Sequence, residues 1–419
     1  MSLFNTASLD IFRIKEFRYF IYARFFLTVA IQMQFSTISL QIYYEHTDDP
    51  LVQGMIGLTE AIPFVVTCFF SGIVADTYNR RKILLAGIFV LFLGCVLLYF
   101  HSASFSLFLK NTGMTVLFSI VFLFGIIRAF LAACTHPFMS QLVPRVHYTN
   151  SATWNSTAWH VGAILGPVLA GIIYGYKGKL NADTCYLIDC ILFLISIYFI
   201  FRISSKPKPV REEKETLVQA MTVGLKFVFK NKMVLSALTL DLFAVLFGGA
   251  VAMIPMFNDK ILHLGPEAYG LLRTSPAIGA VLMALVMAVK PPAKRAGLAL
   301  IWSVIGFGIF TILFAFCTNY WLALLALLMT GAFDNVSVVV RHSILQLSTP
   351  DNMRGRVTAV NNIFIGSSNE IGAFESGVAA KAMGLVPSIV FGGAMTIATV
   401  LGITKLNPKL KTMDLTKYE

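Results

Sequence analysis

Residues 72–82 read Gly72-Ile-Val-Ala-Asp76-Thr-Tyr-Asn79-Arg80-Arg81-Lys82, a short polar turn that follows one long apolar segment and precedes another. The apolar segment on the N-terminal side spans residues 51–75, and the one on the C-terminal side spans residues 83–99. An apolar segment of about 20 residues can cross the roughly 30 Å hydrocarbon core of a bilayer as a helix. The turn therefore predicts a basic hairpin that joins two membrane-spanning helices.

The composition of the whole chain is that of an integral membrane protein. Of its 419 residues, 57% are hydrophobic and 13% are charged, and the mean hydropathy is +0.75. Soluble domains carry about 25% charged residues. Helices are expected because they satisfy every backbone amide within the bilayer. Twelve spans are predicted, at residues 17–44, 51–75, 83–101, 114–138, 152–176, 185–202, 232–257, 266–289, 297–316, 319–341, 357–381 and 386–404.

The positive charge is distributed unevenly across these predicted spans. The chain has 33 Lys and Arg residues and a formal net charge of +12. We place 25 of them on one side, at both termini and in the loops after even-numbered spans, five on the other side and three inside spans. Cytoplasmic loops carry an excess of Lys and Arg. We therefore expect a multi-pass protein of a bacterial inner (cytoplasmic) membrane with both termini cytoplasmic, whose basic residues face lipid headgroups and not nucleic acid.

A polar segment divides the predicted spans into two groups of six. Residues 206–215 are polar, contain Pro and carry mixed charge, and residues 217–230 follow with apolar residues at helical spacing. This pattern predicts a linker that ends in an amphipathic helix at the cytoplasmic interface. The expected organisation is an N-terminal half at residues 1–202, a linker at residues 203–231 and a C-terminal half at residues 232–419.

An internal repeat supports this division. The segment Gln141-Leu-Val-Pro144 aligns with Gln346-Leu-Ser-Thr-Pro350 when one inserted residue is allowed. The same alignment places Asn155 on Asn361 and Gly166 on Gly372. The connection between the fourth and fifth spans is therefore predicted to be equivalent to the connection between the tenth and eleventh.

The turn at residues 72–82 resembles the loop signature of the major facilitator superfamily, which reads Gly-x-x-x-Asp, a basic residue, x, Gly and two basic residues. Four residues match it: Gly72, Asp76, Arg80 and Arg81. Thr77 replaces a basic residue, and Asn79 replaces the glycine. Because Asn tolerates left-handed backbone angles, we expect the turn to form. The resemblance implies an all-α membrane transporter whose twelve helices form two pseudo-symmetric six-helix halves.

The acid of this turn is expected at the membrane edge beside the two arginines. There it can pair with them and with a neighbouring helix in one transport state, which would make the turn a breakable latch between the halves. The alternative is a solvated basic turn that only sets the topology. The predicted cytoplasmic gate consists of Gly72, Asp76, Arg80, Arg81 and, with His342 beside it, Arg341.

The fifth predicted span carries Gly162, Gly166 and Gly171, with Pro167 directly after the second glycine. Glycines at this spacing lie near one helical face and permit close approach of another backbone, while the proline removes a hydrogen bond. The pattern resembles the Gly-Pro kink in the fifth helix of facilitator antiporters, which implies export. Ordinary packing through small residues is the alternative.

The eleventh predicted span is unusually polar. It contains Asn361-Asn-Ile-Phe-Ile-Gly-Ser-Ser-Asn-Glu370-Ile-Gly-Ala-Phe-Glu375, which predicts a helix that faces protein or a wet cavity instead of lipid. Together with residues 334–341 and 349–357, it resembles the facilitator subgroup that includes the enterobactin exporter and macrolide efflux proteins. This resemblance is specific for the family and unspecific for the substrate. Residues 290–295 contain no acid, so a second latch is not expected.

Charged side chains inside a bilayer are costly and therefore mark functional candidates. The predicted spans contain Arg24, Glu60, Arg128, Asp189, Asp241, Arg273, Asp334, Glu370 and Glu375. In the facilitator fold the first, fourth, seventh and tenth helices line the central cavity. The resemblance places on them Arg24, Arg128, Asp241 and Asp334. These four residues, with Glu60 and Glu370, are the predicted proton-coupling or substrate-binding set.

Within this set, Asp241 and Glu370 are the expected proton carriers, because a buried acid can be neutral near physiological pH. Arg128 is the expected partner or substrate anchor, and Glu60 is nearly as strong a candidate. The alternative is that some of these charges form permanent ion pairs that hold the bundle closed. For Asp189, on the peripheral sixth helix, a structural hydrogen bond to a neighbouring helix is expected.

The sequence contains no pattern of an enzyme. It has no Walker loop, no dinucleotide-binding glycine pattern and no nucleophile with its base, which argues against ATP-driven pumping by this chain alone. The six cysteines have neither CxxC spacing nor a His partner arrangement, and we interpret them as apolar fillers without a metal. We expect no enzymatic activity and no cofactor.

The leading hypothesis is a proton-coupled exporter of an amphipathic organic compound, siderophore or drug-like, that works by alternating access as a monomer. The alternative is an uptake symporter or facilitator of a small nutrient on the same fold, in which the predicted proton carriers bind substrate. A transport-dead sensor is a third interpretation, which the short loops disfavour. The expected partners are a small-molecule substrate, protons and the lipid bilayer.

Overall fold

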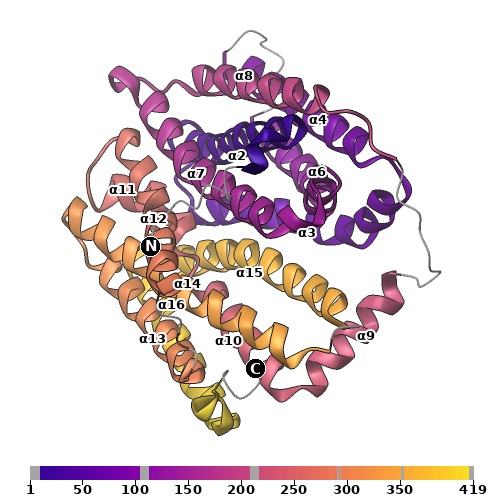
Figure 1. The fold of residues 1–419 in the computed structure, drawn as a ribbon. Helices are drawn as coiled ribbons and strands as arrows, with labels where there is room; N and C mark the ends of the chain where they lie inside the picture. Colours follow the sequence, from indigo (N-terminus) through magenta and orange to yellow (C-terminus); the bar gives the residue numbers. More distant parts are fainter. Residues whose placement is uncertain are drawn as a thin grey trace. The chain divides into compact units, whose positions relative to one another are not determined.

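A computed structural model shows that the chain is built from helices (Figure 1). The structure describes residues 10–103, 113–207, 217–289, 292, 294–350 and 353–414. No strand occurs among these residues. Most of the predicted linker, at residues 208–216, lies outside the described residues, as do residues 290, 291 and 293 of the loop in which no second latch was expected.

Six long helices correspond to the first six predicted spans. They are α2 (Lys15–Gln41), α3 (Pro50–Thr77), α4 (Arg80–Ser102), α6 (Met114–Ser140), α7 (Tyr148–Tyr174) and α8 (Ala182–Phe201). A 3₁₀ turn, η1 (Asp10–Arg13), precedes α2, and a π-helical turn, η2 (Ile42–His46), extends it. The helices agree with the predicted spans within a few residues because the apolar segments end where polar turn residues begin.

The segment predicted to be an amphipathic linker helix forms α9 (Leu217–Lys230). The helices that follow are α10 (Lys232–Phe247), α11 (Ile254–Lys260), α12 (Pro266–Val289), α13 (Ala296–Ala315), α14 (Tyr320–Ser348), α15 (Arg354–Met383) and α16 (Leu385–Leu406). A 3₁₀ turn, η7 (Pro408–Thr412), follows α16. The C-terminal region thus continues the helical plan of the N-terminal one.

The seventh predicted span is interrupted in the structure. A 3₁₀ turn, η5 (Gly249–Met253), separates α10 from α11. Gly248 precedes this turn, and a Cβ on Gly249 would lie 2.4 Å from the carbonyl oxygen of Gly372 in α15. The missing side chain therefore permits α15 to approach the break in the helix.

Eleven helical segments in the described part of the chain are long and apolar enough to span a membrane, with α10, η5 and α11 counted as one. The remaining long helix is α15, whose 30 residues extend over about 45 Å. It is long enough to span but too polar to be selected by hydropathy, which agrees with the prediction that the eleventh span does not face lipid. The predicted all-α architecture is confirmed, and the helix count is consistent with twelve spans.

The chain forms two compact units. The first comprises Met1–His46 and Ile62–Lys214, and the second comprises Thr47–Ala61 and Glu215–Glu419. The division passes through α3, close to Pro63, which lies inside the helix. The N-terminal part of α3 therefore belongs to the unit that contains the last six spans.

The same helix pairings occur inside each unit. In the first unit α2 packs against α7 and α8, and α4 packs against α6 and α8. In the second unit α10 packs against α15 and α16, and α13 packs against α14 and α16. Each unit therefore brings its first helix to its fifth and sixth, and its third helix to its fourth and sixth, as the predicted pseudo-symmetry requires.

Two glycines that the internal repeat aligned occupy equivalent contacts. A Cβ on Gly166 of α7 would lie 2.6 Å from Cβ of Gln32 in α2, and a Cβ on Gly372 of α15 would lie 2.7 Å from the carbonyl oxygen of Val245 in α10. Small residues allow membrane helices to pack closely. The fifth helix of each unit therefore packs on the first helix through a glycine at the same position of the repeat.

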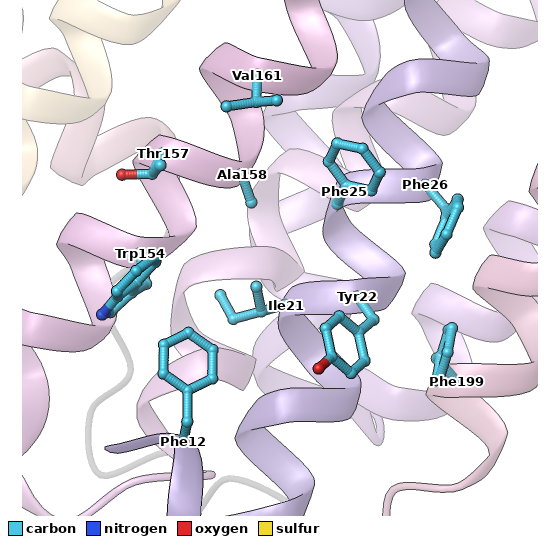
Figure 2. Close-up of a pocket in the computed structure, with 10 residues that line it drawn as sticks. All are labelled: Phe12, Ile21, Tyr22, Phe25, Phe26, Trp154, Thr157, Ala158, Val161 and Phe199. Atoms are coloured by element: carbon cyan, nitrogen blue, oxygen red, sulfur yellow. The ribbon is translucent and has the colours of Figure 1, made fainter. Parts of the chain in front are cut away.

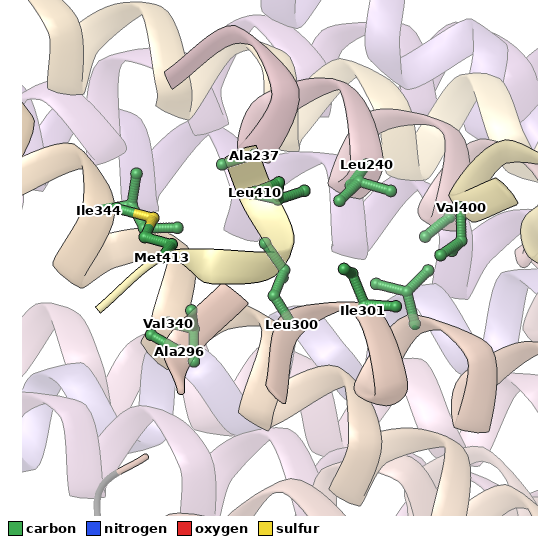
Figure 3. Packing of buried hydrophobic residues seen from close by; sticks show 12 residues of the cluster. Ala237, Leu240, Ala296, Leu300, Ile301, Val340, Ile344, Val400, Leu410 and Met413 are labelled. Carbon is green, nitrogen blue, oxygen red and sulfur yellow. The ribbon is translucent and has the colours of Figure 1, made fainter. Parts of the chain in front are cut away.

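A hydrophobic cluster in the second unit surrounds the inner ends of several helices (Figure 3). Its buried members include Ala237, Leu240, Ala296, Leu300, Ile301, Val340, Ile344, Val400, Leu410 and Met413. Their side chains point toward one another from α10, α13, α14, α16 and the C-terminal segment. Leu240 and Val340 directly precede two charged residues, Asp241 and Arg341, so packing of the cluster fixes where both charges lie.

Candidate functional site

Two buried charges of the second unit form an ion pair. Nη1 of Arg341 in α14 contacts Oδ1 of Asp241 in α10. Arg341 is 2% exposed and Asp241 is 6% exposed. Removing one member of such a pair leaves an uncompensated buried charge, which costs about 3–5 kcal/mol. The pair therefore fixes α10 to α14 for as long as both groups remain charged.

This pairing differs from the partners that the sequence suggested. Arg341 was assigned to the cytoplasmic gate and Arg128 was the expected partner of Asp241, whereas the structure places Arg341 against Asp241. The contact has the form of the alternative interpretation, in which buried charges hold helices together. Asp334 lies two turns before Arg341 on α14 and is half-buried.

Two further predicted acids meet where α3 packs on α15 in the second unit. A Cβ on Gly57 would lie 2.8 Å from the carbonyl oxygen of Glu370 and 3.1 Å from its Oε2 atom. Glu60 follows Gly57 by about one helical turn and is 1% exposed. The structure therefore brings Glu60 and Glu370 to neighbouring turns of one helix contact. Two carboxylates in such a space repel each other if both are ionised.

Glycines make this helix contact close. A Cβ on Gly54 would lie 2.9 Å from the carbonyl oxygen of Ala373, and a Cβ on Gly377 would lie 2.6 Å from the carbonyl oxygen of Pro50. Glycines from both helices therefore face one another, and neither backbone is held away by a side chain. This packing places Glu370, Ala373 and Gly377 of α15 against α3.

Two ion pairs lie near the end of the same contact, and the sequence reasoning did not single them out. Nζ of Lys260 is 2.6 Å from Oδ2 of Asp48, and Nζ of Lys381 is 2.7 Å from Oδ2 of Asp49. These hydrogen bonds to lysine hold the pKa of each carboxyl below its usual value. The available signal was the Asp-Asp pair in the loop, together with lysines at the predicted outer ends of two spans.

The first unit holds the two predicted cavity arginines. The guanidinium of Arg128 in α6 lies 5.6 Å from the ring centre of Phe35 and 5.9 Å from that of Phe64. Arg24 of α2 is half-buried, and its Nε atom is buried without a hydrogen-bond partner in the described part of the chain. A cation over aromatic rings suits a substrate with aromatic or anionic groups. The pairing of Arg128 with Asp241 remains a prediction.

The hairpin between α3 and α4 forms a set of short polar contacts. Nη2 of Arg80 is 3.0 Å from Oδ1 of Asp76, and Nε of Arg80 donates to the carbonyl oxygen of Ala75. Arg81 donates from Nε to the carbonyl oxygen of Ile200 and from Nη2 to that of Phe201. A cation at these carbonyls complements the C-terminus of α8. The turn is therefore bound to the end of the sixth span, while Gly72 lies half-buried one turn before Asp76.

The expected role of Asn79 in this hairpin was wrong. Its backbone is extended, with φ −66°, and not left-handed. Asn79 is the N-cap of α4, where Oδ1 accepts from the backbone N–H of Lys82 at 3.2 Å. Its Nδ2 donates to Oγ of Ser205 and to the carbonyl oxygen of Lys206. The turn forms because Asn caps the helix and holds the chain that follows α8.

The fifth-helix glycines pack against α2. A Cβ on Gly162 would lie 2.8 Å from Cβ of Thr28, and Gly166 makes the close contact described above. Gly171 is buried, and Pro167 lies inside α7, which continues as one helix on both sides of it. These contacts have the form of small-residue packing, the alternative interpretation, and the antiporter-like kink remains a prediction.

Asp189 of α8 does not make the structural hydrogen bond that the sequence analysis expected. The residue is fully buried, and neither carboxyl oxygen has a hydrogen-bond partner among the described residues. The prediction was wrong because the side chains that face Asp189 are the thiols of Cys95, Cys185 and Cys190, and none of them forms a hydrogen bond with its carboxyl group. Of the other two intramembrane charges, Arg273 donates to the carbonyl oxygen of Val251, and Glu375 is half-buried on α15.

An apolar pocket of about 540 Å³ lies in the first unit at the N-terminal end of α2 (Figure 2). Its lining residues are Phe12, Ile21, Tyr22, Phe25, Phe26, Trp154, Thr157, Ala158, Val161 and Phe199. The Phe12 and Trp154 rings pack edge to face with their centres 4.7 Å apart, and the Phe26 and Phe199 rings stack with their centres 6.2 Å apart. None of the predicted charged candidates lines this pocket, so it is separate from the charged sites.

Metal ligation finds no support in the described residues. No group of three or more His, Cys, Asp or Glu side chains there is arranged to hold a metal ion. All six cysteines are free thiols. The candidate residues therefore form two separate groups. The second unit holds Asp241 with Arg341, Glu60 and Glu370 on neighbouring turns, and Asp334, and the first unit holds Arg24 and Arg128.

Comparisons with known proteins identify the family of the chain. The sequence model of the Major Facilitator Superfamily matches residues 20–373. A staphyloferrin A transporter of Staphylococcus aureus is 20% identical over 364 residues, which cover 85% of this chain and 88% of the relative. The enterobactin exporter EntS of Salmonella choleraesuis is 22% identical over 344 residues, which cover 82% of this chain and 80% of the relative.

Solved structures show the same fold. The nucleoside transporter NupG superposes with a TM-score of 0.74 at 13% identity, over 93% of this chain and 98% of that chain. A D-xylose-proton symporter superposes with a TM-score of 0.71 at 15% identity, over 97% of this chain and 100% of that chain. At these identities the structural likeness shows the fold alone.

Proposed function

Because the chain belongs to the major facilitator superfamily of membrane transporters, we propose that it is a proton-coupled exporter of an amphipathic organic compound with siderophore-like or drug-like chemistry. Two relatives are named for a siderophore, staphyloferrin A or enterobactin, and one of them is named an exporter. The observation that carries the coupling is the buried contact of Asp241 with Arg341. It joins a group that can take up a proton to a cation on another helix.

Proton uptake by Asp241 changes the charge balance of this pair. The carboxylate gains one proton and becomes neutral, so it no longer neutralises Arg341. The guanidinium of Arg341 then requires another anion, because a buried charge without a counter-ion has a high free energy. An anionic group of the substrate meets that need, and loss of the proton restores the original ion pair. Export follows if the proton enters from the outer side and the substrate from the cytoplasm.

Alternating access requires contacts that close and open at each side of the membrane. We place the outer closure at the pairs of Asp48 with Lys260 and Asp49 with Lys381. We place the cytoplasmic closure at the hairpin of Asp76, where Arg80 is already ion-paired. The two outer pairs are largely exposed, and in the hairpin pair Asp76 is exposed and Arg80 is half-buried. Ion pairs at a protein surface are worth about 0–1 kcal/mol each. Such weak contacts can break in every cycle.

The remaining parts of the proposal follow from the distribution of charge. A bacterial inner-membrane location with both termini cytoplasmic fits the excess of Lys and Arg on one side of the predicted spans. The division into an N-terminal half, a linker and a C-terminal half fits the repeated helix pairings. We propose that the monomer transports, because each unit supplies its own set of buried charges.

Transport in everted membrane vesicles tests this function. Vesicles that contain the chain should accumulate radiolabelled staphyloferrin A or enterobactin when a proton gradient is imposed, and a protonophore should abolish accumulation. Asp241→Asn should lose the response to the gradient, while Asp183→Asn, a change at the start of α8, should retain it. Accumulation that a protonophore leaves unchanged would remove the coupling, and accumulation only in right-side-out vesicles would indicate uptake.

A further inference from the structure

A column of polar side chains runs through the interior of the first unit, and none of the charges discussed above accounts for it. We call it the polar column. Its members are Gln34, Thr37 and Gln41 of α2, Glu45 of η2, Cys95 of α4, and Cys185, Tyr186, Asp189 and Cys190 of α8. Glu45 is exposed, and every other member is at most 8% exposed. The column thus extends from the molecular surface toward a fully buried acid.

The outer part of the polar column is held by hydrogen bonds with good geometry. Tyr186 donates from its hydroxyl to Oε1 of Gln41 at 2.8 Å. Nε2 of Gln41 donates to Oε2 of Glu45 at 3.0 Å and to Oγ of Ser102 at 2.8 Å. Oε1 of Glu45 accepts from the hydroxyl of Tyr174 at 2.8 Å. Glu45 therefore stands at the outer end with both carboxyl oxygens oriented.

The inner part of the polar column consists of thiols and an amide. Sγ of Cys95 donates to the carbonyl oxygen of Tyr186 at 3.3 Å. The same thiol lies beside the side chains of Gln34 and Cys190. Asp189 is adjacent to Cys190 and lies three residues after Tyr186, so it shares a helix face with the tyrosine. The acid therefore lies at the inner end of the column.

Among the residues that the structure describes, no hydrogen-bond donor contacts the carboxyl oxygens of Asp189. On its own helix it faces the thiols of Cys185 and Cys190, and α4 contributes the thiol of Cys95. From α2 the column contributes the amide of Gln34 beside Cys95 and the hydroxyl of Thr37 beside Cys185, and α7 contributes the hydroxyl of Tyr174 farther out. None of these groups is a cation. An isolated buried carboxylate is far more costly than the neutral acid.

A buried amide donor without a partner lies in the inner part of the column, beside the thiol of Cys95. Nε2 of Gln34 is buried and has no hydrogen-bond partner among the described residues. An amide N–H₂ can donate two hydrogen bonds, and a buried donor without an acceptor is itself costly. The amide gains an acceptor when a neighbouring carboxyl loses its proton and reorients. An acid with a purely structural role would need neither the unpaired amide donor of Gln34 nor the hydrogen bonds that lead from Tyr186 to Glu45.

We propose that Asp189 is a proton-binding site that exchanges with the outer aqueous phase along the polar column. The carboxylate of Asp189 takes up one proton, which forms an O–H bond and leaves a neutral acid. On release the proton returns past Tyr186 and Gln41 to Glu45 and water. This assignment rests on the proposed function, because it adds a second coupling acid to Asp241, in the other unit.

Infrared difference spectroscopy on the purified full chain in lipid nanodiscs tests the assignment without transport. A protonated carboxyl has a C=O stretching band that carboxylates lack, and the band shifts when the proton exchanges for deuterium. The wild type should show this band at neutral pH and lose it as the pH is raised. Asp189→Asn should remove the band, whereas the matched change Asp183→Asn on the same helix should leave it unchanged.

The route is tested by the rate of deuterium exchange. Tyr186→Phe keeps the ring but removes the donor to Gln41, so exchange at Asp189 should slow about tenfold, as expected for the loss of one hydrogen bond of roughly 1.4 kcal/mol. Tyr198→Phe, at an exposed position of α8, should not slow it. If Tyr186→Phe exchanges at the wild-type rate, the route is wrong.

The outcomes separate this inference from the proposed function. A titrating band that Asp189→Asn removes supports the inference, even if vesicle transport proves insensitive to a protonophore and the coupling proposal fails. Absence of the band at every pH, or a band that persists at every pH, overturns the inference, even if transport is coupled to protons. If Asp189→Asn does not fold, Asp189→Glu replaces it, and the band should then shift in frequency and still titrate.

Discussion

Arg341 of α14 and Asp241 of α10 form a buried ion pair that joins two helices of the second unit. Neither residue is exposed enough for water to replace its partner. The pair is therefore both a structural contact and a point at which one proton changes the balance of charge. Its two roles can be separated by changing one partner at a time and then both.

Neutralising one member of this pair should destabilise the protein more than neutralising both. Asp241→Asn or Arg341→Gln leaves one buried charge without its counter-ion, and each should cost about 3–5 kcal/mol of unfolding free energy. The double variant should recover a large part of this loss. Thermal unfolding in detergent measures the three variants against the wild type. Single variants as stable as the wild type would show that the pair does not form.

The repeat-related glycines should be equally intolerant of larger side chains. Gly166→Leu and Gly372→Leu each insert a side chain where even a Cβ would lie under 3.0 Å from the neighbouring helix. Overpacking costs typically about 1–3 kcal/mol, and more where backbone must move. Gly402→Leu is the matched control because nothing lies within 4 Å of its Cβ position. Folded yield by size-exclusion chromatography measures the effect, and equal yields would contradict the packing.

Asn79 should behave as a helix cap and not as a left-handed residue. Asn79→Ala should lower the unfolding free energy by about 1 kcal/mol. Asn79→Gly should lower it by a few tenths of that amount and should not raise it. Asn79→Asp keeps the cap but removes the amide donor to Lys206, so it isolates the contribution of that contact. Unfolding temperatures rank the three variants. A glycine variant more stable than the wild type would support the left-handed turn.

The outer ion pairs should give the protein a sensitivity to acid. Hydrogen bonds from Lys260 and Lys381 lower the pKa of Asp48 and Asp49 below the usual value of about 4. A group with a lowered pKa adds stability that is fully present above its unfolded value and lost as the pH falls through its folded value. Acidification below about pH 4 should therefore remove the contribution of both pairs, each under about 1 kcal/mol because they are exposed.

The matched variants for this acid response are Lys260→Gln and Lys381→Gln. Each should reduce the loss of unfolding temperature between neutral and acidic pH, and high salt should do the same in the wild type. Lys179→Gln, at an exposed position outside any ion pair described here, should leave the acid response unchanged. An unaltered acid response in both lysine variants would exclude these pairs as its source.

The helices were predictable from the sequence because each depends on a local pattern. The lengths of the apolar segments predicted eleven of the spans. The polar residues around Asn361 and Glu370 predicted that α15 is a helix that avoids lipid. The break before α11 was not predictable from hydropathy because Gly248 and Gly249 lie within an apolar segment. Their importance appears only when Gly372 of the neighbouring helix is brought to Gly249.

The partners of the charges were not predictable in the same way. Whether Asp241 meets Arg341 or another cation depends on the rotation of α10 and α14 about their axes, which hydropathy does not determine. The burial of Asp189 was expected from its place in a span, but its lack of a hydrogen-bond partner depends on which side chains α2 and α4 direct toward it. Local patterns indicated where charges lie along a helix, and packing decided what they face.

α3 contributes to both compact units, and Pro63 lies just beyond the point of division. Proline has no N–H to donate to the carbonyl oxygen of Thr59. The helix therefore lacks one backbone hydrogen bond at this position and bends there at a lower energetic cost. α3 therefore has a point of reduced bending stiffness at Pro63. Bending at this one position changes the direction of residues 50–61 relative to residues 62–77, while the other hydrogen bonds of the helix stay intact.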